Sequence, residues 1–480
     1  MRITVLGTGY LGATHAASMA EMGFEVLGLD VDPEKVDALS RGELPFHEPG
    51  LGELLRKHVG TGRLRFTTSY EEAGAFGDVH FVGVGTPQRA GSFAADMRYV
   101  DAAVGSIAAA ATKDCVIAGK STVPVGSARR LADLAKASAR EGVDVSLVWN
   151  PEFLREGYAV EDTLAPDRMV LGCQDPAAEA VMRRVYARQL EAGVPLIVTD
   201  FETAELVKVA ANAFLATKIS FINALSELTE AVGGDIRTLA DAIGLDERIG
   251  RKFLNAGVGF GGGCLPKDIR ALRARAAELG VEQSVRFLAE VDDINVRRRG
   301  HTVETVTQML GGTVVGRQVA VLGAAFKPDS DDVRDSPALD IAARLHSIGA
   351  EVAVYDPKAN ANAAKRYPRL DYVDSLEAAV TGAEVVVLLT EWAEFKAMTP
   401  EQLDPLVAVP QILDGRNVLD PDRWTAAGFT YRALGRRALE EGQRGQHRGL
   451  HPAAGRGGDA VHRLRDPHPG VSGPRDRGRR

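Results

Sequence analysis

Cysteine is scarce in this sequence, which has only Cys115, Cys173 and Cys264 among its 480 residues. The three are too few and too scattered for a disulfide framework. None has the spacing of a metal-ligand pair, so we expect no metal site. Cys115 and Cys173 stand beside short apolar runs and are expected to be small core residues. Cys264 differs from them because a run of glycines precedes it.

Excess positive charge and long apolar runs are also lacking. The formal net charge of −8 argues against a general role on nucleic acids or membrane surfaces, since both need a positive field. No apolar run approaches the length of a membrane span and the N-terminus has no signal-peptide layout, so we expect a cytoplasmic protein. With 45% hydrophobic and 25% charged residues, the composition predicts a globular protein of two or three domains.

Short apolar strands alternate with amphipathic helical patterns in two separate blocks. The predicted strands are residues 3–6, 25–30, 79–84, 115–118 and 145–149 in the first block, and 317–323, 351–356 and 384–390 in the second. Between the blocks, residues 201–231 carry apolar side chains at helical spacing without Gly or Pro, which predicts one long helix. The pattern favours an α/β fold class: two Rossmann-like, doubly wound domains joined by a central helical segment, with a ligand cleft between them.

These patterns divide the chain into four parts. We expect a first α/β domain over residues 1–199, a central helical domain over 200–312 and a second α/β domain over 313–436. Residues 437–480 are rich in Arg, Gly, Pro and His without apolar periodicity, which predicts disorder. A nucleic-acid-binding arm is one alternative, but this tail has no Lys and no aromatic residue. A second alternative is that the tail arises from translation past a disrupted reading frame.

Three glycines with dinucleotide-binding spacing, Gly7, Gly9 and Gly12, directly follow the first predicted strand. Gly7 permits a tight turn, Gly9 lets the backbone approach a pyrophosphate, and Gly12 lets the next helix pack on the strand. Asp30 ends the second predicted strand, where a carboxylate would bind the ribose hydroxyls and favour NAD over NADP. The motif therefore predicts an NAD site. The alternative is a glycine-rich turn in an unrelated α/β fold.

The second block lacks this turn, because it keeps Gly323 but has Ala325 where the next glycine would stand. It cannot cradle a pyrophosphate in the same way. Lys327 and Arg334 nevertheless place positive charge near a strand end, which suits the nucleotide part of an anionic substrate. The alternative is two solvated surface charges.

The segment around Cys264 carries the clearest chemical signal. Glycines 261–263 leave it without side chains to pack, and Pro266 suits the first turn of a helix. A thiol at the positive end of that helix, with Lys267 nearby, is expected to have a lowered pKa. Asp268 stands about one turn further and could reach back to the sulfur or to a water. The alternative is a glycine-rich helix entrance with an incidental thiol.

Polar residues at helical spacing and at strand ends extend this signal. Lys208 and Asn212 share one face of the long helix with Glu205, and a Lys beside an Asn can stabilise an oxyanion. Glu152 and Glu156 follow a predicted strand and could position a water or act as a general base. The alternatives are a solvated stripe for the helix pair and solvated or capping carboxylates for the loop.

Together these motifs resemble the UDP-glucose/GDP-mannose dehydrogenase family over about residues 1–436. The likeness rests on the Lys208 and Asn212 pair and on GTGYLG at 7–12, VGTP at 84–87, STVPVGS at 121–127, NPEFLREG at 150–157, FGGGCLPKD at 260–268 and FKPDSDDVRDSP at 326–337. The tail matches nothing in the family pattern.

The resemblance implies a four-electron oxidation of a nucleotide sugar by two NAD molecules, through a thiohemiacetal and a thioester on Cys264. It implies that Lys208 and Asn212 hold the oxyanion, while Thr122, Glu152, Glu156 and Asp268 order water or move protons. The implied NAD contacts are Gly7, Gly9, Tyr10, Leu11, Gly12, Asp30, Lys35, Thr86, Thr122, Glu156, Lys267 and Arg334. The implied substrate contacts are Glu152, Phe153, Leu154, Lys208, Asn212, Arg248, Phe253, Leu254, Asn255, Ala256, Gly257, Gly261 and Lys327.

The resemblance also implies a partner, because Arg248 looks like the arginine that such enzymes lend to a neighbouring subunit. We therefore expect a homodimer or a higher homo-oligomer. Motif wording favours UDP-glucose as the substrate over GDP-mannose, the main alternative, and over N-acetylated sugars. Two other classes stay open: a hydroxyacid dehydrogenase, which needs no cysteine, and a sensor that binds without turnover.

Overall fold

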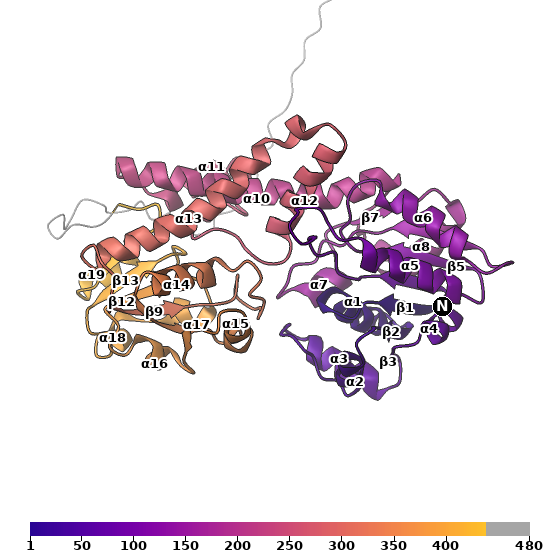
Figure 1. Cartoon of the computed structure of the whole chain (residues 1–480), viewed down its shortest axis with the longest axis horizontal. Coiled ribbons are helices and arrows are strands. Elements are labelled where there is room, and N and C mark those ends of the chain that lie inside the picture. The colour runs from indigo at the N-terminus through magenta and orange to yellow at the C-terminus, as the bar shows by residue number, and fades with distance from the viewer. Residues whose placement is uncertain (438–480) are drawn as a thin grey trace, which may run out of the picture. The chain divides into compact units, whose positions relative to one another are not determined.

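The computed structural model describes residues 1–437 of the chain (Figure 1). The tail for which the sequence predicts disorder lies outside the described residues beyond Arg437. The described part contains two mainly parallel sheets with helices, and a long helix between them, which confirms the predicted fold class.

The first sheet has eight strands in the order β3-β2-β1-β4-β5-β6-β7-β8. Their bounds are β1 Arg2–Leu6, β2 Glu25–Leu29, β3 Leu64–Thr67, β4 Val79–Val82, β5 Cys115–Gly119, β6 Val145–Trp149, β7 Met169–Gly172 and β8 Leu196–Thr199. β1 pairs with both β2 and β4, so the strand order reverses at β1. Ligands of doubly wound sheets bind outside the carboxyl ends of the strands at such a reversal.

Helices pack against this sheet and bury its apolar side chains in two hydrophobic clusters. They are α1 Tyr10–Glu21, α2 Pro33–Ser40, α3 Leu51–Gly60, α4 Tyr70–Phe76, α5 Arg98–Ala110, α6 Ser127–Ser138, α7 Ala159–Leu164, α8 Pro176–Val185 and α9 Ala187–Glu191. Several begin at capping side chains: Asp32, Ser69 and Asp175 accept backbone N–H groups of α2, α4 and α8. These caps satisfy groups that a helix start leaves unpaired.

The five strands predicted in the first block are all present, and they pair in parallel with one another. β6 and β7 are antiparallel, with Trp149 opposite Gly172. The connection between them contains the short helix α7. Cys115 is buried as expected, whereas Cys173 is only half-buried and its thiol donates to the Asp175 carbonyl at 3.1 Å.

The predicted long helix is α10, Phe201–Val232, which starts at the capping side chain of Asp200 and ends at Gly233 in a left-handed conformation. Within the described part of the chain, it is the one helix that is long and apolar enough to cross a membrane. Its buried polar residues, including Glu205, Lys208 and Asn212, and its packing against α12 and α13 are instead those of a core helix.

The helical segment continues with α11 Ile236–Gly244, α12 Leu265–Glu278, a short 3₁₀ turn over Glu282–Val285 and α13 Phe287–Met309. Ala216 of α10, Phe260, Ile269 of α12 and Leu288 of α13 share one small core. Because Phe260 belongs to this core, the glycine-rich segment that follows it is held against the helices.

The second sheet has the order β11-β10-β9-β12-β13-β14, and every pair in it is parallel. Its strands are β9 Gln318–Leu322, β10 Glu351–Tyr355, β11 Asp371–Tyr372, β12 Val385–Leu388, β13 Gln411–Asp414 and β14 Thr430–Ala433. Its helices are α14 Pro337–Ser347, α15 Asn360–Arg366, α16 Leu376–Val380, α17 Ala393–Ala397, α18 Pro400–Leu403 and α19 Pro421–Ala426. The three strands predicted in the second block are β9, β10 and β12.

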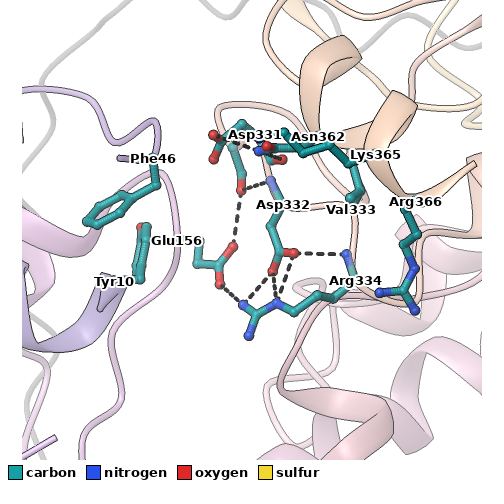
Figure 2. A pocket seen from close by; sticks show the side chains of 11 residues that line it. Tyr10, Phe46, Glu156, Asp331, Asp332, Val333, Arg334, Asn362, Lys365 and Arg366 are labelled. Carbon is teal, nitrogen blue, oxygen red and sulfur yellow. Dashed lines mark hydrogen bonds and ion pairs between the residues drawn. The ribbon is translucent and has the colours of Figure 1, made fainter. Parts of the chain in front are cut away.

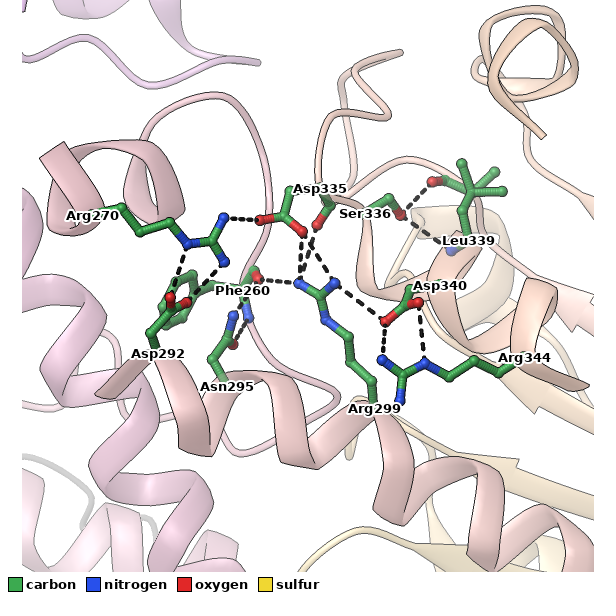
Figure 3. A network of polar contacts seen from close by, with 11 residues as sticks. Phe260, Arg270, Asp292, Asn295, Arg299, Asp335, Ser336, Leu339, Asp340 and Arg344 are labelled. Atoms are coloured by element: carbon green, nitrogen blue, oxygen red, sulfur yellow. Dashed lines mark hydrogen bonds and ion pairs between the residues drawn. The ribbon is translucent and has the colours of Figure 1, made fainter. Parts of the chain in front are cut away.

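A polar network ties the loop of residues 326–337, between β9 and α14, to the helical segment (Figure 3). Arg270 of α12 donates to Asp292 of α13 at 2.8 and 2.9 Å and to Asp335 of the loop at 3.4 Å. Arg299 of α13 donates to the Asp335 carboxylate at 3.1 Å. Two arginines thus fix one end of this loop beside the start of α12.

Candidate active site

The turn between β1 and α1 has the geometry that a dinucleotide needs. Gly7 has a φ of +82°, and a Cβ on Gly12 would lie 1.7 Å from the Gly7 carbonyl oxygen. Gly9 faces open space, since a Cβ there would meet nothing within 4 Å. Gly9 also precedes α1 without a side-chain cap, so the helix start is free to receive an anion. Tyr10 and Leu11 form the first turn of that helix.

Asp30 lies directly after β2 and faces the same turn. Its Oδ2 accepts from the Thr8 backbone N–H at 2.8 Å and from the Lys35 ammonium at 3.1 Å. Burial opposes ionisation of Asp30, but the hydrogen bonds from Thr8 and Lys35 outweigh it and lower the pKa of the carboxyl. Asp30 is therefore a carboxylate at neutral pH, and the predicted cofactor residue Lys35 lies against it.

The loops after β4 and β5 meet beside this turn. The hydroxyl of Thr86 donates to the Thr122 carbonyl oxygen at 2.7 Å, and the hydroxyl of Ser121 donates to the Val84 carbonyl oxygen at 2.7 Å. The structure thus brings together two predicted cofactor residues, Thr86 and Thr122, at the carboxyl ends of neighbouring strands.

Cys264 stands at the N-cap position of α12, as the sequence predicts. Its three preceding glycines are closely packed, contrary to expectation. A Cβ on Gly261 would lie 2.3 Å from the Asp335 carbonyl oxygen, and one on Gly263 would lie 2.4 Å from the Arg334 guanidinium. A Cβ on Gly262 would meet the Phe326 ring at 2.8 Å. The glycines are therefore the surface on which the loop of residues 326–337 rests.

The expectation that the Cys264 thiol has a lowered pKa was wrong. Cys264 is a solvent-exposed residue, but the protein atoms around its thiol desolvate the charged form, and this desolvation, followed by the charge of Asp268, raises the pKa of the thiol to about 11. The cation that opposes them is Lys208, whereas Lys267 is paired with Asp268 at 2.7 Å. At neutral pH this raised pKa favours the neutral thiol over the thiolate.

Two polar pairs from separate elements face this thiol. Asn212 of α10 donates to Asp268 Oδ2 at 2.6 Å, and the Lys208 ammonium, one turn earlier, lies 3.4 Å from Glu152 Oε1. Burial acts to lower the pKa of Lys208, but the negative charges of Glu152 and Asp268 act against it, and the pKa is raised. Lys208 is thus a buried ammonium group, only 5% exposed, among acidic neighbours.

Glu156 connects the loop after β6 to the loop of residues 326–337. Its carboxylate accepts from the Ser330 hydroxyl at 3.1 Å and from Arg334 at 3.3 Å, while its carbonyl oxygen accepts from Lys327 at 2.5 Å. Burial, followed by the nearby charge of Asp332, raises the pKa of Glu156 to about 7. A predicted catalytic carboxyl thus titrates near neutrality.

A cavity of about 410 Å³ opens beside these groups, as expected of a cleft between the two α/β domains (Figure 2). Tyr10, Phe46 and Glu156 line one side, and the other side is lined by residues 330–334 with Asn362, Lys365 and Arg366. Phe46, Lys365 and Arg366 carry no sequence motif that would have singled them out.

The other predicted substrate residues fall into two groups. Phe153 and Leu154 lie beside the Lys208–Glu152 pair: the Lys208 ammonium is 5.5 Å from the Phe153 ring centroid, and the Leu154 N–H donates to Glu152. In the segment 253–257, Leu254 and Ala256 bury their side chains in a core with Ile222. The Gly257 N–H donates to Asn223, Asn255 accepts from Arg251, and Phe253 has a positive φ of 66°.

The sequence analysis did not single out two charged residues, Arg416 and Glu48, and it gave Glu205 no role beyond its place on a helix face. Arg416, after β13, donates to the Leu389 and Gly259 carbonyl oxygens, and its second terminal nitrogen is buried without a partner in the described part of the chain. Glu48 is a buried carboxylate in the loop between α2 and α3. Glu205, noted only for its helical face, accepts the Gly126 and Ala128 N–H groups at 2.6 Å each. A buried acid in a loop gives no periodic signal, which is why Glu48 escaped notice.

Comparison with known proteins agrees with this geometry. Three family models match: the NAD binding domain of the UDP-glucose/GDP-mannose dehydrogenase family over residues 1–190, its central domain over 202–297 and its UDP binding domain over 320–421. The UDP-glucose 6-dehydrogenase YwqF of Bacillus subtilis is 41% identical over 440 residues, covering 92% of this chain and 98% of that protein.

Solved structures show the same relationship. A UDP-glucose dehydrogenase from the hyperthermophilic archaeon Pyrobaculum islandicum superposes with a TM-score of 0.83 at 37% identity, over 91% of this chain and 98% of that chain. A GDP-mannose dehydrogenase from Pseudomonas aeruginosa gives a TM-score of 0.50 at 29% identity, over 90% of this chain and 100% of that chain. Fold, cofactor turn and relatives define an NAD-dependent nucleotide-sugar dehydrogenase. The chain belongs to the UDP-glucose/GDP-mannose dehydrogenase family.

The cofactor turn generates a prediction that separates stability from NAD binding. Gly9→Ala meets open space at a φ of −69°, so we expect unfolding free energy within about 0.5 kcal/mol of wild type but at least ten-fold weaker NAD binding. Gly12→Ala collides with backbone and should cost about 3 kcal/mol or more. Thermal unfolding and calorimetric NAD titration measure both effects. Equal NAD affinity in Gly9→Ala and wild type would contradict the assignment of this turn.

Glu205 generates a pH prediction. Burial raises its pKa to about 7, against the N–H groups of Gly126 and Ala128, from an ordinary value of 4.5. The folded chain therefore keeps this proton while the unfolded chain releases it, and the stability that it contributes is lost as pH rises from about 4.5 through about 7.

The Tm of Glu205→Gln minus that of wild type should increase between about pH 5 and pH 8. Glu202→Gln, one turn earlier, is the control, with a flat difference in this window because its pKa is lowered by Arg129. A flat difference for Glu205→Gln would refute the prediction.

Proposed function

We propose that the enzyme oxidises UDP-glucose to UDP-glucuronate in two steps, with Cys264 as the covalent nucleophile. The observation that carries this proposal is the meeting of the Cys264 thiol, the buried Lys208 ammonium and the Asn212–Asp268 pair at the start of α12. NAD, when bound at the Gly7–Gly12 turn, accepts the hydride in each step, so one sugar consumes two NAD molecules.

In the first step the C6 alcohol loses a hydride and a proton and becomes an aldehyde. The thiol of Cys264 then adds to it: sulfur bonds to the carbonyl carbon, and the S–H proton ends on the carbonyl oxygen as the thiohemiacetal forms. The proton leaves sulfur as the carbon–sulfur bond forms, because the thiolate is the attacking form, and no proton leaves the site overall. The Lys208 ammonium and the Asn212 amide are the donors that stabilise the oxygen.

In the second step the thiohemiacetal carbon loses a hydride and its hydroxyl loses a proton, which leaves a thioester on Cys264. Water then attacks the thioester carbon, the carbon–sulfur bond breaks, and the thiol regains a proton as the carboxylic acid leaves. Thr122, Glu152, Glu156 and Asp268 are the groups proposed to order this water and move protons. The covalent route keeps the reactive aldehyde from escaping.

The choice of UDP-glucose as substrate rests on the relatives. A UDP-glucose 6-dehydrogenase is 41% identical, and the GDP-mannose dehydrogenase structure is 29% identical with a lower TM-score than the UDP-glucose dehydrogenase structure. GDP-mannose remains the second candidate. Steady-state turnover of both sugars decides between them, and a higher kcat/KM for GDP-mannose would overturn our choice.

The stoichiometry of NADH tests the covalent mechanism. Wild type should form two NADH per sugar, whereas a hydroxyacid dehydrogenase would form one and a sensor none. Cys264→Ser should form at most one NADH per sugar and no acid, because an alkoxide is harder to generate than a thiolate. Cys115→Ser, at a buried cysteine of the core, is the matched control and should keep two. Full acid formation by Cys264→Ser would refute the mechanism.

We further propose a homodimer built on α10. An apolar row on this helix is exposed at spacings of seven residues: Phe214 by 65%, Phe221 by 51% and Leu228 by 58%. Such a stripe is typical of a surface that another copy covers. The side chain of Arg248 is 89% exposed and is held by Asp246 at 2.6 Å. This placement suits an arginine that completes a partner's substrate site.

Mixing two inactive variants tests this arrangement. Arg248→Ala and Cys264→Ser should each be severely impaired alone. If Arg248 acts across the interface, a co-refolded equal mixture should recover about a quarter of wild-type activity, because half of the dimers then hold one complete site out of two. If Arg248 acts within its own subunit, no complete site can form. Activity in the mixture no higher than in the separate variants would exclude the cross-subunit role.

A further inference from the structure

The buried carboxylate of Glu48 has no part in the proposed chemistry, yet both of its oxygens are fully engaged. Glu48 belongs to the loop between α2 and α3 and is only 5% exposed. Its Oε1 accepts the Ala159 N–H at 2.7 Å, and its Oε2 accepts the Gly157 N–H at 2.7 Å together with the Tyr10 hydroxyl. One side chain therefore joins two segments that lie 147 residues apart.

One of these segments is the cofactor turn. Tyr10 is the first residue of α1, directly after Gly9, and its hydroxyl also accepts from the Gly157 N–H at 3.1 Å. Burial and the hydrogen bond to Glu48 raise the pKa of Tyr10, so its hydroxyl stays a proton donor at every working pH. The Phe46 ring packs on Tyr10 with centroids 5.0 Å apart, and both rings line the cavity in Figure 2. A displacement of Tyr10 therefore acts directly on Glu48.

The other segment is the catalytic loop after β6. Gly157 follows Glu156, whose carbonyl oxygen accepts from Lys327 and whose carboxylate contacts Ser330. Gly157 has a φ of +83°, and a Cβ there would lie 3.1 Å from the Asp329 side chain. The peptide of Gly157 is thus held by Glu48 and Tyr10 on one side and by the loop of residues 326–337 on the other.

We propose that Glu48 is a positioning residue that couples the cofactor turn to the nucleotide-sugar loop, so that NAD and the nucleotide bind cooperatively. The inference rests on the proposed function, together with the predicted contacts of Tyr10 with the cofactor and of Lys327 with the substrate. A carboxylate can accept both N–H groups and the hydroxyl at once, and its burial leaves no room for these three groups to move independently. An ordering of either site therefore changes the other, and the effect is reciprocal.

Calorimetric titration of the full chain tests the coupling. NAD affinity is measured with and without saturating UDP in wild type, Glu48→Gln and Tyr10→Phe. Glu53→Gln, an exposed glutamate of α3, serves as the matched control. In wild type and the control, UDP should strengthen NAD binding about five-fold or more. In Glu48→Gln the amide N–H₂ would face a backbone N–H, and the enhancement should fall below about two-fold. Tyr10→Phe should lose the enhancement as well. This variant keeps the Glu48 carboxylate and its hydrogen bonds to the backbone, so it still tests the coupling if Glu48→Gln fails to fold.

The outcomes separate this inference from the proposed function. A wild type without enhancement, or variants in which both affinities fall but the enhancement persists, would reduce Glu48 to a structural anchor while leaving the proposed reaction intact. If UDP fails to bind wild type at all, both the substrate assignment and the coupling are overturned. If the variants lose the UDP-induced gain in NAD affinity although wild type does not oxidise UDP-glucose, the coupling stands and the proposed substrate is wrong.

Discussion

The close contact between glycines 261–263 and the loop of residues 326–337 is the constraint on which the active site depends. The space that three Cβ atoms would fill is occupied by the Asp335 carbonyl, the Phe326 ring and the Arg334 guanidinium. A side chain at Gly261 would push the backbone of the loop away from the start of α12, whereas one at Gly263 would displace the Arg334 side chain. Because Arg270 and Arg299 hold the same loop through Asp335, the backbone contact and the ion pairs fix one geometry. Cys264 follows this run directly, at the start of α12.

Desolvation by the surrounding protein dominates the electrostatics of the Cys264 thiol. A helix N-terminus lowers a thiol pKa when water can solvate the thiolate, but here burial and Asp268 dominate. Lys208 is the cation that opposes them, and its own charge is stabilised by Glu152. The positive charge of Lys267 is offset by its ion pair with Asp268, the next residue of α12. The structure thus places a thiol with a raised pKa beside a buried ammonium group, and the proposed addition to an aldehyde rests on this arrangement.

The sequence predicted those features that depend on local pattern. Alternation of apolar runs identified β1, β2, β4, β5 and β6 and the whole of α10, and the glycine spacing identified the cofactor turn. Motif position placed Cys264 at the start of α12 and Lys208 and Asn212 on one buried face. Features that depend on tertiary contact were not predictable. The antiparallel pairing of β7 follows from how the connection folds, and the pairing of Lys267 with Asp268 rather than with the thiol is a choice of rotamer within one turn. Glu48 is recognised only when the chain brings Tyr10, Gly157 and Ala159 around it.

The reactivity of Cys264 in the free enzyme tests the raised pKa of its thiol most directly. Alkylation by iodoacetamide, followed by mass spectrometry of the peptide that carries Cys264, gives its rate as a function of pH. With a pKa of about 11 against about 8.5 for free cysteine, and allowing for the greater nucleophilicity of a more basic thiolate, the rate at neutral pH should be more than about ten-fold below that of free cysteine. It should keep rising past pH 9. A rate at or above that of free cysteine, with a plateau below about pH 8.5, would contradict the account.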